Sequence, residues 1–215
     1  MFSAEHFLDL LIMGWLSNIP LAIGSIISIS VFCERLVSFR GLEASSRQMA
    51  GKTIDAIVRR DLEAAKRICA ASKLPVAAAF HEALGWENVA AEDLDRVLAT
   101  RRAEIASGLK RGVWMIGTVG SLAPFVGLLG TVVGIIRAFG VMSKSGETGF
   151  QVVSANLSEA LIATAAGLGV AIVALIFFNY LQIRIGSLNA VYARASERLV
   201  QALIYIDTNT GENEA

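Results

Sequence analysis

The sequence predicts an all-α membrane protein with three transmembrane helices, in which long second and third helices extend into a helical cytoplasmic domain. Two observations carry this prediction. Hydrophobic residues make up 54% of the 215 residues and the mean hydropathy is +0.58, which is more apolar than the core of a soluble domain of this size requires. The apolar residues are concentrated in three runs, each long enough to cross a bilayer as a helix.

The first apolar run, residues 10–32, predicts the first transmembrane helix. It stops at Glu34-Arg35 and contains only a few polar or turn residues. A cleaved signal peptide begins with a basic region, whereas this N-terminus carries Glu5 and Asp9 and no Lys or Arg before the run. We therefore expect an uncleaved anchor.

Residues 113–142 and 157–183 predict the second and third transmembrane helices. Each run is long enough for one span at a helical rise of about 1.5 Å per residue. A short polar turn at Ser143–Phe150 lies between them. The two helices are therefore expected to be antiparallel neighbours.

The segment between the first and second spans is predicted to be helical, with a break at Pro75. Its apolar residues recur at helical intervals, at Ile54, Ile57, Val58, Leu62, Ala65 and Ile68 and again at Leu94, Val97, Leu98, Ile105 and Leu109. No strong stop signal is apparent between Glu92 and Trp114, so the second span is expected to continue as one long helix into the cytoplasm. The pattern at Leu188–Ile206 extends the third span in the same way.

Basic residues predict the orientation, because Lys and Arg concentrate on the cytoplasmic side of membrane proteins. Fourteen of the 19 lie between Arg35 and Arg111, and others follow the third span. The predicted order is a periplasmic N-terminus at 1–9, the first span at 10–32, a helical cytoplasmic segment at 33–112, the second span at 113–142, a periplasmic turn at 143–156, the third span at 157–183, and a cytoplasmic helix and tail at 184–215.

Several function classes have no support in the sequence. The 19 basic and 19 acidic residues balance, which gives no bulk attraction for nucleic acid. The two cysteines, Cys33 and Cys69, and the two histidines, His6 and His81, match no metal-ligand spacing. No phosphate loop, nucleophile elbow or pair of catalytic carboxylates is recognisable. We expect neither an enzyme nor a cofactor.

Each of the last two spans carries a stripe of small residues on one helical face. In the second span the stripe is Gly120, Pro124, Gly127, Thr131, Gly134 and Ala138, and in the third it is Ala160, Thr164, Gly167, Ala171 and Ala174. Close helix packing explains such stripes without any further function. The threonine in each stripe, Thr131 and Thr164, lies near mid-bilayer and suggests a polar lining instead, although a threonine can also satisfy its hydroxyl on its own helix.

Titratable residues are nearly absent from these two spans, which contain only Arg137 and Glu159, both predicted near the outer end. Ionisable residues inside membrane spans are rare and are usually functional. Proton transfer requires a titratable relay, and a mid-membrane Asp or Glu is missing. If the assembly conducts protons, a partner must supply that carboxylate.

Two runs, APFVGLLGTVVGI at Ala123–Ile135 and SEALIATAAGLGVAI at Ser158–Ile172, resemble the paired signatures of the MotA/TolQ/ExbB proton channel family. The resemblance extends over about the whole chain. It implies a ring of five subunits whose second and third helices line a lumen, occupied by two single-span helices of an ExbD/TolR-like partner that carries a membrane aspartate.

The resemblance also implies roles for individual residues. Thr131 and Thr164 match the lumen threonines near the aspartate, Glu159 matches a glutamate at the outer mouth, and Asn179 matches an asparagine lower in the third helix. The implied packing stripe around the lumen is Pro124, Gly127, Gly134, Ala160, Gly167 and Ala171. The sequence departs from the family at Val173, where many members have proline, at Val133, where tryptophan is common, and at Arg137, which is read either as a side chain reaching the outer surface or as a contact for ions or the partner.

The resemblance implies a stator or channel subunit of an ion-driven motor in the bacterial inner membrane. TonB-type import, Tol-type envelope maintenance and gliding motility all remain open, as does sodium in place of protons. The alternative from a different class is a non-conducting membrane scaffold whose small stripes only pack helices. A small-molecule transporter predicts broken helices and repeated halves, and neither is visible.

Overall fold

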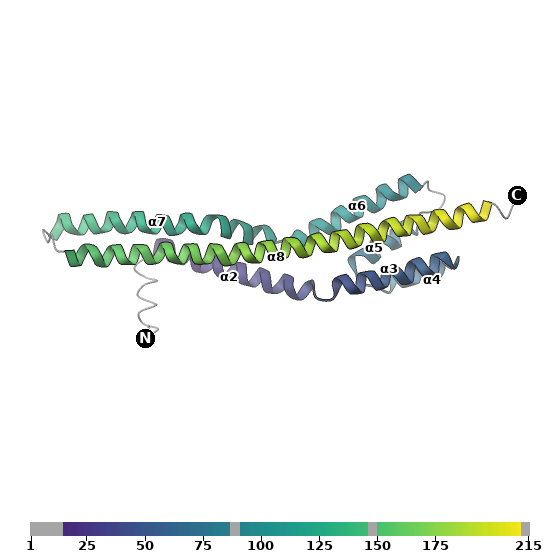
Figure 1. The fold of residues 1–215 in the computed structure, drawn as a ribbon, viewed down its shortest axis with the longest axis horizontal. Helices are drawn as coiled ribbons and strands as arrows, with labels where there is room; N and C mark the ends of the chain where they lie inside the picture. The colour runs from purple at the N-terminus through teal and green to yellow at the C-terminus, as the bar shows by residue number, and fades with distance from the viewer. Residues whose placement is uncertain (1–14, 87–90, 146–149, 212–215) are drawn as a thin grey trace. The chain divides into compact units, whose positions relative to one another are not determined.

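The computed structural model describes residues 15–86, 91–145 and 150–211, and these residues form the helices of Figure 1. In chain order the helices are α2 (Trp15–Ser38), α3 (Leu42–Val58), α4 (Leu62–Ala70), α5 (Pro75–Ala83), α6 (Ala91–Lys110), α7 (Val113–Ser145) and α8 (Phe150–Gly211). Three stretches are long and apolar enough to cross a membrane, with mean hydropathies of 1.6, 2.1 and 2.6. The all-helical membrane fold with a long third helix is therefore confirmed, while the predicted periplasmic N-terminus at 1–9 lies outside the described residues.

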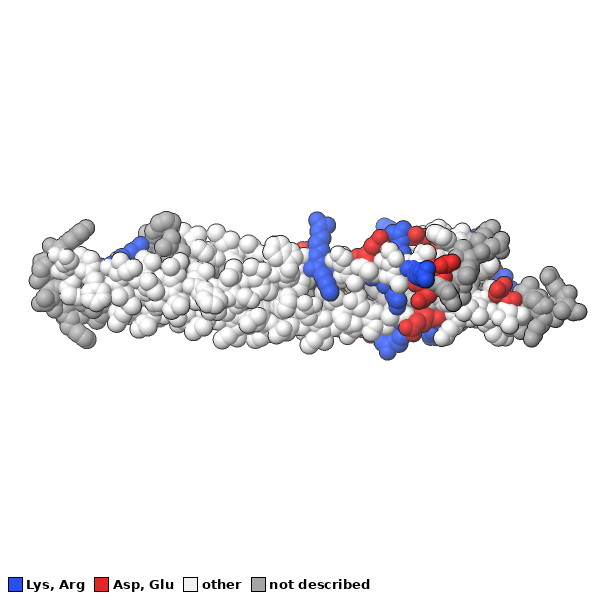
Figure 2. Space-filling view, turned by 90° about the horizontal axis from the view of Figure 1, so that it is seen from above, with Lys and Arg blue, Asp and Glu red and all other residues white. Residues whose placement is uncertain are grey.

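The first compact unit comprises residues 1–35 and 112–181, and we call it the membrane unit. In it α7 and the first part of α8 lie side by side and antiparallel, with α2 against them (Figure 1). Large apolar side chains cover its outside, among them Ile26, Phe125, Phe139 and Ile172. On the face that Figure 2 shows, Lys, Arg, Asp and Glu are nearly absent from this unit and gather over the other one. An apolar exterior of this kind suits lipid or another apolar subunit.

The expected continuous helix from the cytoplasm into the second span is wrong. The chain forms two helices instead, because α6 ends at Lys110 and α7 begins at Val113. Gly112, between them, has a φ of +77°, a left-handed conformation that ends helices and that glycine adopts at low cost. Basic residues in a last helical turn followed by glycine are a helix stop signal, and Lys110-Arg111-Gly112 carries it.

The connection between the second and third spans is shorter than the predicted polar turn. Helix α7 continues to Ser145, and α8 already begins at Phe150, so both ends of the 143–156 segment are helical. Residues 146–149, which join the helices, lie outside the described part of the chain. The third span then continues without interruption to Gly211, as the pattern at Leu188–Ile206 indicated.

The second compact unit comprises residues 36–111 and 182–215, and we call it the cytoplasmic unit in keeping with the predicted topology. Helix α3 packs on α4 and α5, and α5 packs on α6. The largest buried side chains of this unit include Ile57, Phe80, Leu98, Tyr192 and Leu199. The unit has its own core, which a segment of short helices needs because each buries only one face.

Two sharp turns divide the helical pattern that the sequence shows between residues 54 and 75. Arg60 has a φ of +61°, and the Asp61 side chain accepts a hydrogen bond of 2.8 Å from the Ala64 backbone N–H, which caps α4. Pro75 occupies the first turn of α5, where its missing N–H costs no helical hydrogen bond. The break at Pro75 is thus confirmed, and the break at Arg60 was not predicted.

The two cysteines behave differently. Cys69 is buried beside Thr53, whose hydroxyl oxygen lies 3.6 Å from the sulfur, whereas Cys33 is exposed on α2. Burial raises the pKa of the Cys69 thiol, an effect partly offset by its contact with Thr53. Because the thiol stays protonated at neutral pH, Cys69 packs as a small apolar residue in the core of the cytoplasmic unit.

Candidate functional site

The closest approach of α7 and α8 in the membrane unit lies at Gly127 and Gly167. A Cβ added at Gly167 would stand 2.7 Å from the Ala123 carbonyl oxygen and 3.0 Å from the Gly127 Cα. A Cβ added at Gly127 would stand 3.0 Å from the Thr164 Cα. Backbone meets backbone at this crossing, so a side chain at Gly167 would force the helices apart, and one at Gly127 would make a tight contact.

A hydrogen bond links the two helices at the same level. The Thr164 hydroxyl donates to the Gly127 carbonyl oxygen over 2.9 Å. The bond brings together two residues that the sequence placed in separate stripes. Such interhelical bonds in membranes contribute about 0.6 kcal/mol on average and up to about 1.7 kcal/mol.

The hydroxyl of Thr131 is also bonded to α7. It donates to the carbonyl oxygen of Leu128 over 2.7 Å, on the same helical turn that receives the bond from Thr164. Both threonine side chains are half-buried. The two residues predicted to line an ion path therefore converge on the turn Gly127–Thr131, in the middle of an otherwise apolar span.

A second close contact in this turn escaped the sequence analysis. A Cβ added at Gly130 would stand 2.8 Å from the Ser17 hydroxyl oxygen on α2 and 2.9 Å from the Ala163 Cβ on α8. Gly130 therefore marks one of the points where all three helices of the membrane unit meet. The sequence signal that could have indicated this contact is Gly130 itself, a second glycine about one turn after Gly127 and outside the main stripe.

The residues of the predicted lumen stripe differ in burial. Ala160 and Ala171 are buried, like Gly127 and Gly167, whereas Pro124 and Gly134 are half-buried. Four of the six residues of the predicted lumen stripe thus lie inside the packing of a single subunit, which is the role that close helix packing alone requires.

The polar residues predicted away from the threonines lie at other levels of α8. Glu159 is half-buried and lies about one turn before Thr164, while Asn179 is exposed and lies roughly 22 Å further along the helix. Arg137 is exposed on α7, towards the end of the helix at Ser145. No group of three or more potential metal-ligating side chains occurs among the described residues.

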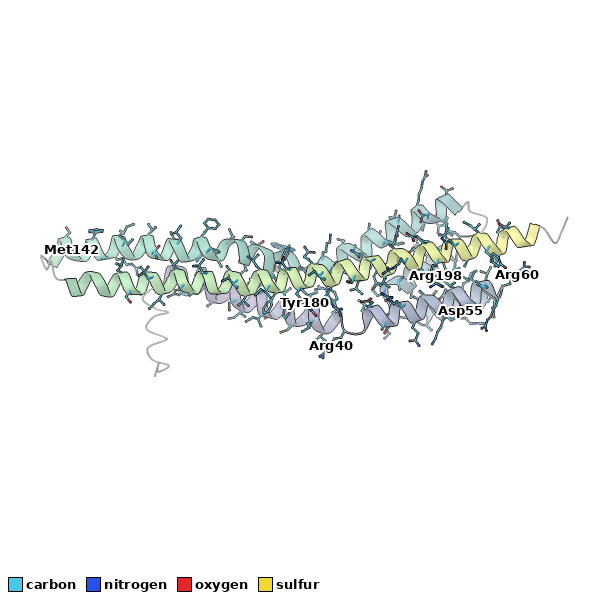
Figure 3. The ribbon with its side chains drawn as sticks, in the orientation of Figure 1. Arg40, Asp55, Arg60, Met142, Tyr180 and Arg198 are labelled. Atoms are coloured by element: carbon cyan, nitrogen blue, oxygen red, sulfur yellow. The ribbon has the colours of Figure 1, made fainter. Side chains whose placement is uncertain are left out.

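An aromatic cluster closes the end of the membrane unit that faces the predicted cytoplasm. The rings of Phe32 on α2 and Phe177 on α8 stack with centroids 3.9 Å apart. Tyr180, labelled in Figure 3, meets Phe32 edge-on at 5.9 Å. A Cβ at Gly117 would stand 2.9 Å from the Phe178 ring. These contacts fix α2 and α7 against α8 between the threonines and the predicted cytoplasmic end of the membrane unit.

Chemically, the site offers hydroxyl and carbonyl oxygens surrounded by apolar side chains. Among the described membrane residues between Trp15 and Phe32 and between Val113 and Leu181, the acidic side chain is that of Glu159. The Thr131–Thr164 level therefore has no titratable group of its own. It can hold a polar or protonated group in a region where lipid cannot.

Comparison with known proteins identifies the family of the chain. The model of the MotA/TolQ/ExbB proton channel family matches residues 46–193. The biopolymer transport protein ExbB of Salmonella typhimurium is 40% identical over 93 residues, which are 43% of this chain and 38% of that protein. The Tol-Pal system protein TolQ of Haemophilus influenzae is 40% identical over 84 residues, which are 39% of this chain and 37% of that protein.

A longer match is found with the ExbB-like 3 biopolymer transport protein of Synechocystis sp., which is 27% identical over 168 residues, 77% of this chain and 80% of that protein. The matches to the Salmonella and Haemophilus proteins each span less than half of those proteins. The family match, in contrast, includes α7, both threonines and most of the third span. The chain belongs to the MotA/TolQ/ExbB proton channel family.

Proposed function

We propose that this multi-pass inner-membrane protein is the channel and stator subunit of a proton-driven motor. Five copies would form a ring around two single-span helices of an ExbD/TolR-like partner, with the N-terminus periplasmic and the C-terminus cytoplasmic. The observation that carries the proposal is the pair of half-buried threonines, Thr131 and Thr164, bonded to one turn of α7 in an apolar span. Family membership supports the same conclusion.

In this proposal the partner supplies the titratable group. Among the described residues the Thr131–Thr164 level has hydroxyl oxygens but no carboxylate, so the partner's membrane aspartate would carry the proton past it. A proton motive force of about 200 mV corresponds to roughly 4.6 kcal/mol per proton. A change of a two-state assembly from 1:99 to 99:1 takes about 5.5 kcal/mol, so the free energy of one proton covers most of such a change.

The work performed by the motor is proposed to be on periplasmic or outer-membrane partners. The relatives named above are a biopolymer transport protein and a Tol-Pal system protein, and both are 40% identical over their aligned segments. TonB-type import and Tol-type envelope maintenance are therefore supported equally, with gliding motility as a third possibility. Strains that lack this chain, compared with the same strains complemented with it, separate these functions. Loss of TonB-type import shows as poor growth under iron limitation, and loss of Tol function shows as sensitivity to detergent.

A non-conducting scaffold is the second candidate, and the close contact of Gly127 with Gly167 is the observation that favours it. Packing of this kind needs no ion path. The two candidates differ in what the threonine hydroxyls do, since a scaffold needs only the volume of each side chain.

Native mass spectrometry tests the proposed assembly. The chain is co-expressed with an ExbD/TolR-like single-span, aspartate-bearing protein and purified in mild detergent. We expect a complex of five copies of this chain with two of the partner. A homo-oligomer that never retains the partner would contradict the proposal and favour the scaffold.

A further inference from the structure

Helix α2 ends in an arginine whose donors are not all satisfied. The Arg35 side chain lies in the last turn of α2 and is 14% exposed. Its Nε nitrogen is buried and has no hydrogen-bond partner among the described residues. Its ion pair is with Glu34, whose carboxylate oxygen lies 3.7 Å from Nη2, too far for a hydrogen bond. Because a guanidinium stays charged and can only donate, Arg35 needs an acceptor that the described chain does not supply.

Arg35 lies at the predicted cytoplasmic end of the membrane unit, where lipid headgroups begin. Val31, one turn earlier on α2, lies at the start of α7, since a Cβ added at Gly112 would stand 3.6 Å from Val31 Cγ1. Phe32 stacks on Phe177 of α8. Residues three and four positions apart share one helical face. Arg35 therefore follows Val31 and Phe32 on the face of α2 that packs against α7 and α8.

The surroundings of Arg35 combine features of a membrane surface with positive charge. Trp114 is 66% exposed and Tyr180 is 42% exposed, as in the aromatic belts where membrane proteins meet the headgroups. Arg111 directly precedes the turn at Gly112, and the first turn of α7 contains no acidic residue. An anion at this level would be attracted by the guanidinium and by the positive end of the α7 dipole.

We propose that Arg35 binds the phosphate group of an anionic lipid at the predicted cytoplasmic surface. The phosphate offers the acceptors that Arg35 lacks, and Nε and Nη2 form a fork that matches two of its oxygens. No hydrogen bond among the described residues holds Nε in place, so the side chain can turn towards a headgroup without losing one. The span before Arg35 exposes Ile26 and Ile29, which suits the acyl chains. The proposal needs only the membrane setting and is independent of the proposed motor.

Native mass spectrometry with added lipid tests the proposal. The chain is purified as its oligomer in mild detergent, stripped of lipid, and titrated with dioleoylphosphatidylglycerol or dioleoylphosphatidylcholine. We expect the wild type to prefer phosphatidylglycerol, because only that headgroup has a net negative charge. Arg35→Gln should bind it at least about tenfold more weakly, because hydrogen bonds between charged groups are lost. Arg35→Lys keeps the charge but not the fork, so its affinity should lie between the two.

Arg40→Gln is the matched control. It removes a charge of the same sign from an exposed residue five positions further along the chain (Figure 3). This variant should bind phosphatidylglycerol like the wild type. Thermal unfolding midpoints without added lipid show whether each variant is folded, and Arg35→Lys keeps the test usable if Arg35→Gln does not assemble.

Four results would overturn the proposal. Equal weakening by Arg35→Gln and Arg40→Gln would show a general attraction to positive charge. Wild-type lipid affinity in Arg35→Gln would show that Nε meets another acceptor, such as a neighbouring subunit. Wild-type affinity in Arg35→Lys would show that the fork plays no part. Displacement of the lipid by an equal concentration of inorganic phosphate would show a site for soluble anions.

Discussion

Replacing Gly167 by alanine is expected to destabilise the membrane unit by about 1–3 kcal/mol, the usual cost of adding a methyl group to a well-packed contact. The new Cβ would stand 2.7 Å from the Ala123 carbonyl oxygen and 3.0 and 3.2 Å from the Gly127 Cα and nitrogen. All three neighbours are backbone atoms of α7, so no side chain can rotate away. The two helices would have to separate, which would also lengthen the bond from Thr164 to Gly127.

The measurement is the thermal unfolding midpoint of the purified complex in mild detergent, with retention of the partner as a second readout. Gly169→Ala is the matched control, because a Cβ at Gly169, also on α8, meets nothing within 4 Å inside the subunit. Equal midpoints for the two variants would show that the crossing at Gly127 and Gly167 is not close in the assembled protein.

Replacing both threonines by valine is expected to reduce proton flux at least about tenfold while the complex stays assembled. Valine keeps the size of threonine but removes the hydroxyl oxygen, so any polar contact with the moving group is lost. A hydrogen bond to a charged group contributes about 1.5–3 kcal/mol. A loss of about 1.4 kcal/mol corresponds to a tenfold change in an equilibrium constant. The flux is measured in liposomes by a pH-sensitive dye under an imposed potential.

Serine at both positions restores the hydroxyls and should restore most of the flux, whereas Thr118→Val, which removes a hydroxyl bonded to its own helix on α7, should have no effect. The scaffold candidate predicts that valine at both positions leaves assembly intact and that the threonine hydroxyls carry no proton flux. If Thr131→Val with Thr164→Val leaves flux and assembly at the wild-type level, the threonines serve packing alone and the proposed ion path is wrong.

Much of this fold could be predicted because membrane helices leave a strong sequence signal. Long apolar runs, the basic segment between them and the small stripes predicted three helices and a long α8. The motif runs around Thr131 and Thr164 led to the family before any contact was known. These features depend on composition and period, which a single sequence displays directly.

The remaining features depend on local backbone conformation and on contacts between segments far apart in the chain. The break at Gly112 was marked in the sequence by basic residues followed by glycine. Arg60, in contrast, adopts a left-handed φ without being glycine, so no residue type marked that turn. The bond from Thr164 to Gly127 joins residues on different helices, and helical periodicity cannot tell which stripe faces which. For the same reason the junction of Gly130 with Ser17 and Ala163 was missed.

Proton flux through the wild-type complex tests the central claim most directly. Liposomes containing the chain with its single-span partner are given a potential, and internal pH is recorded. We expect a proton flux that disappears when the partner's membrane aspartate is changed to asparagine, because the described residues of this chain place no carboxylate at the Thr131–Thr164 level. An assembled complex that conducts no protons, or one that conducts equally well with asparagine, would contradict it.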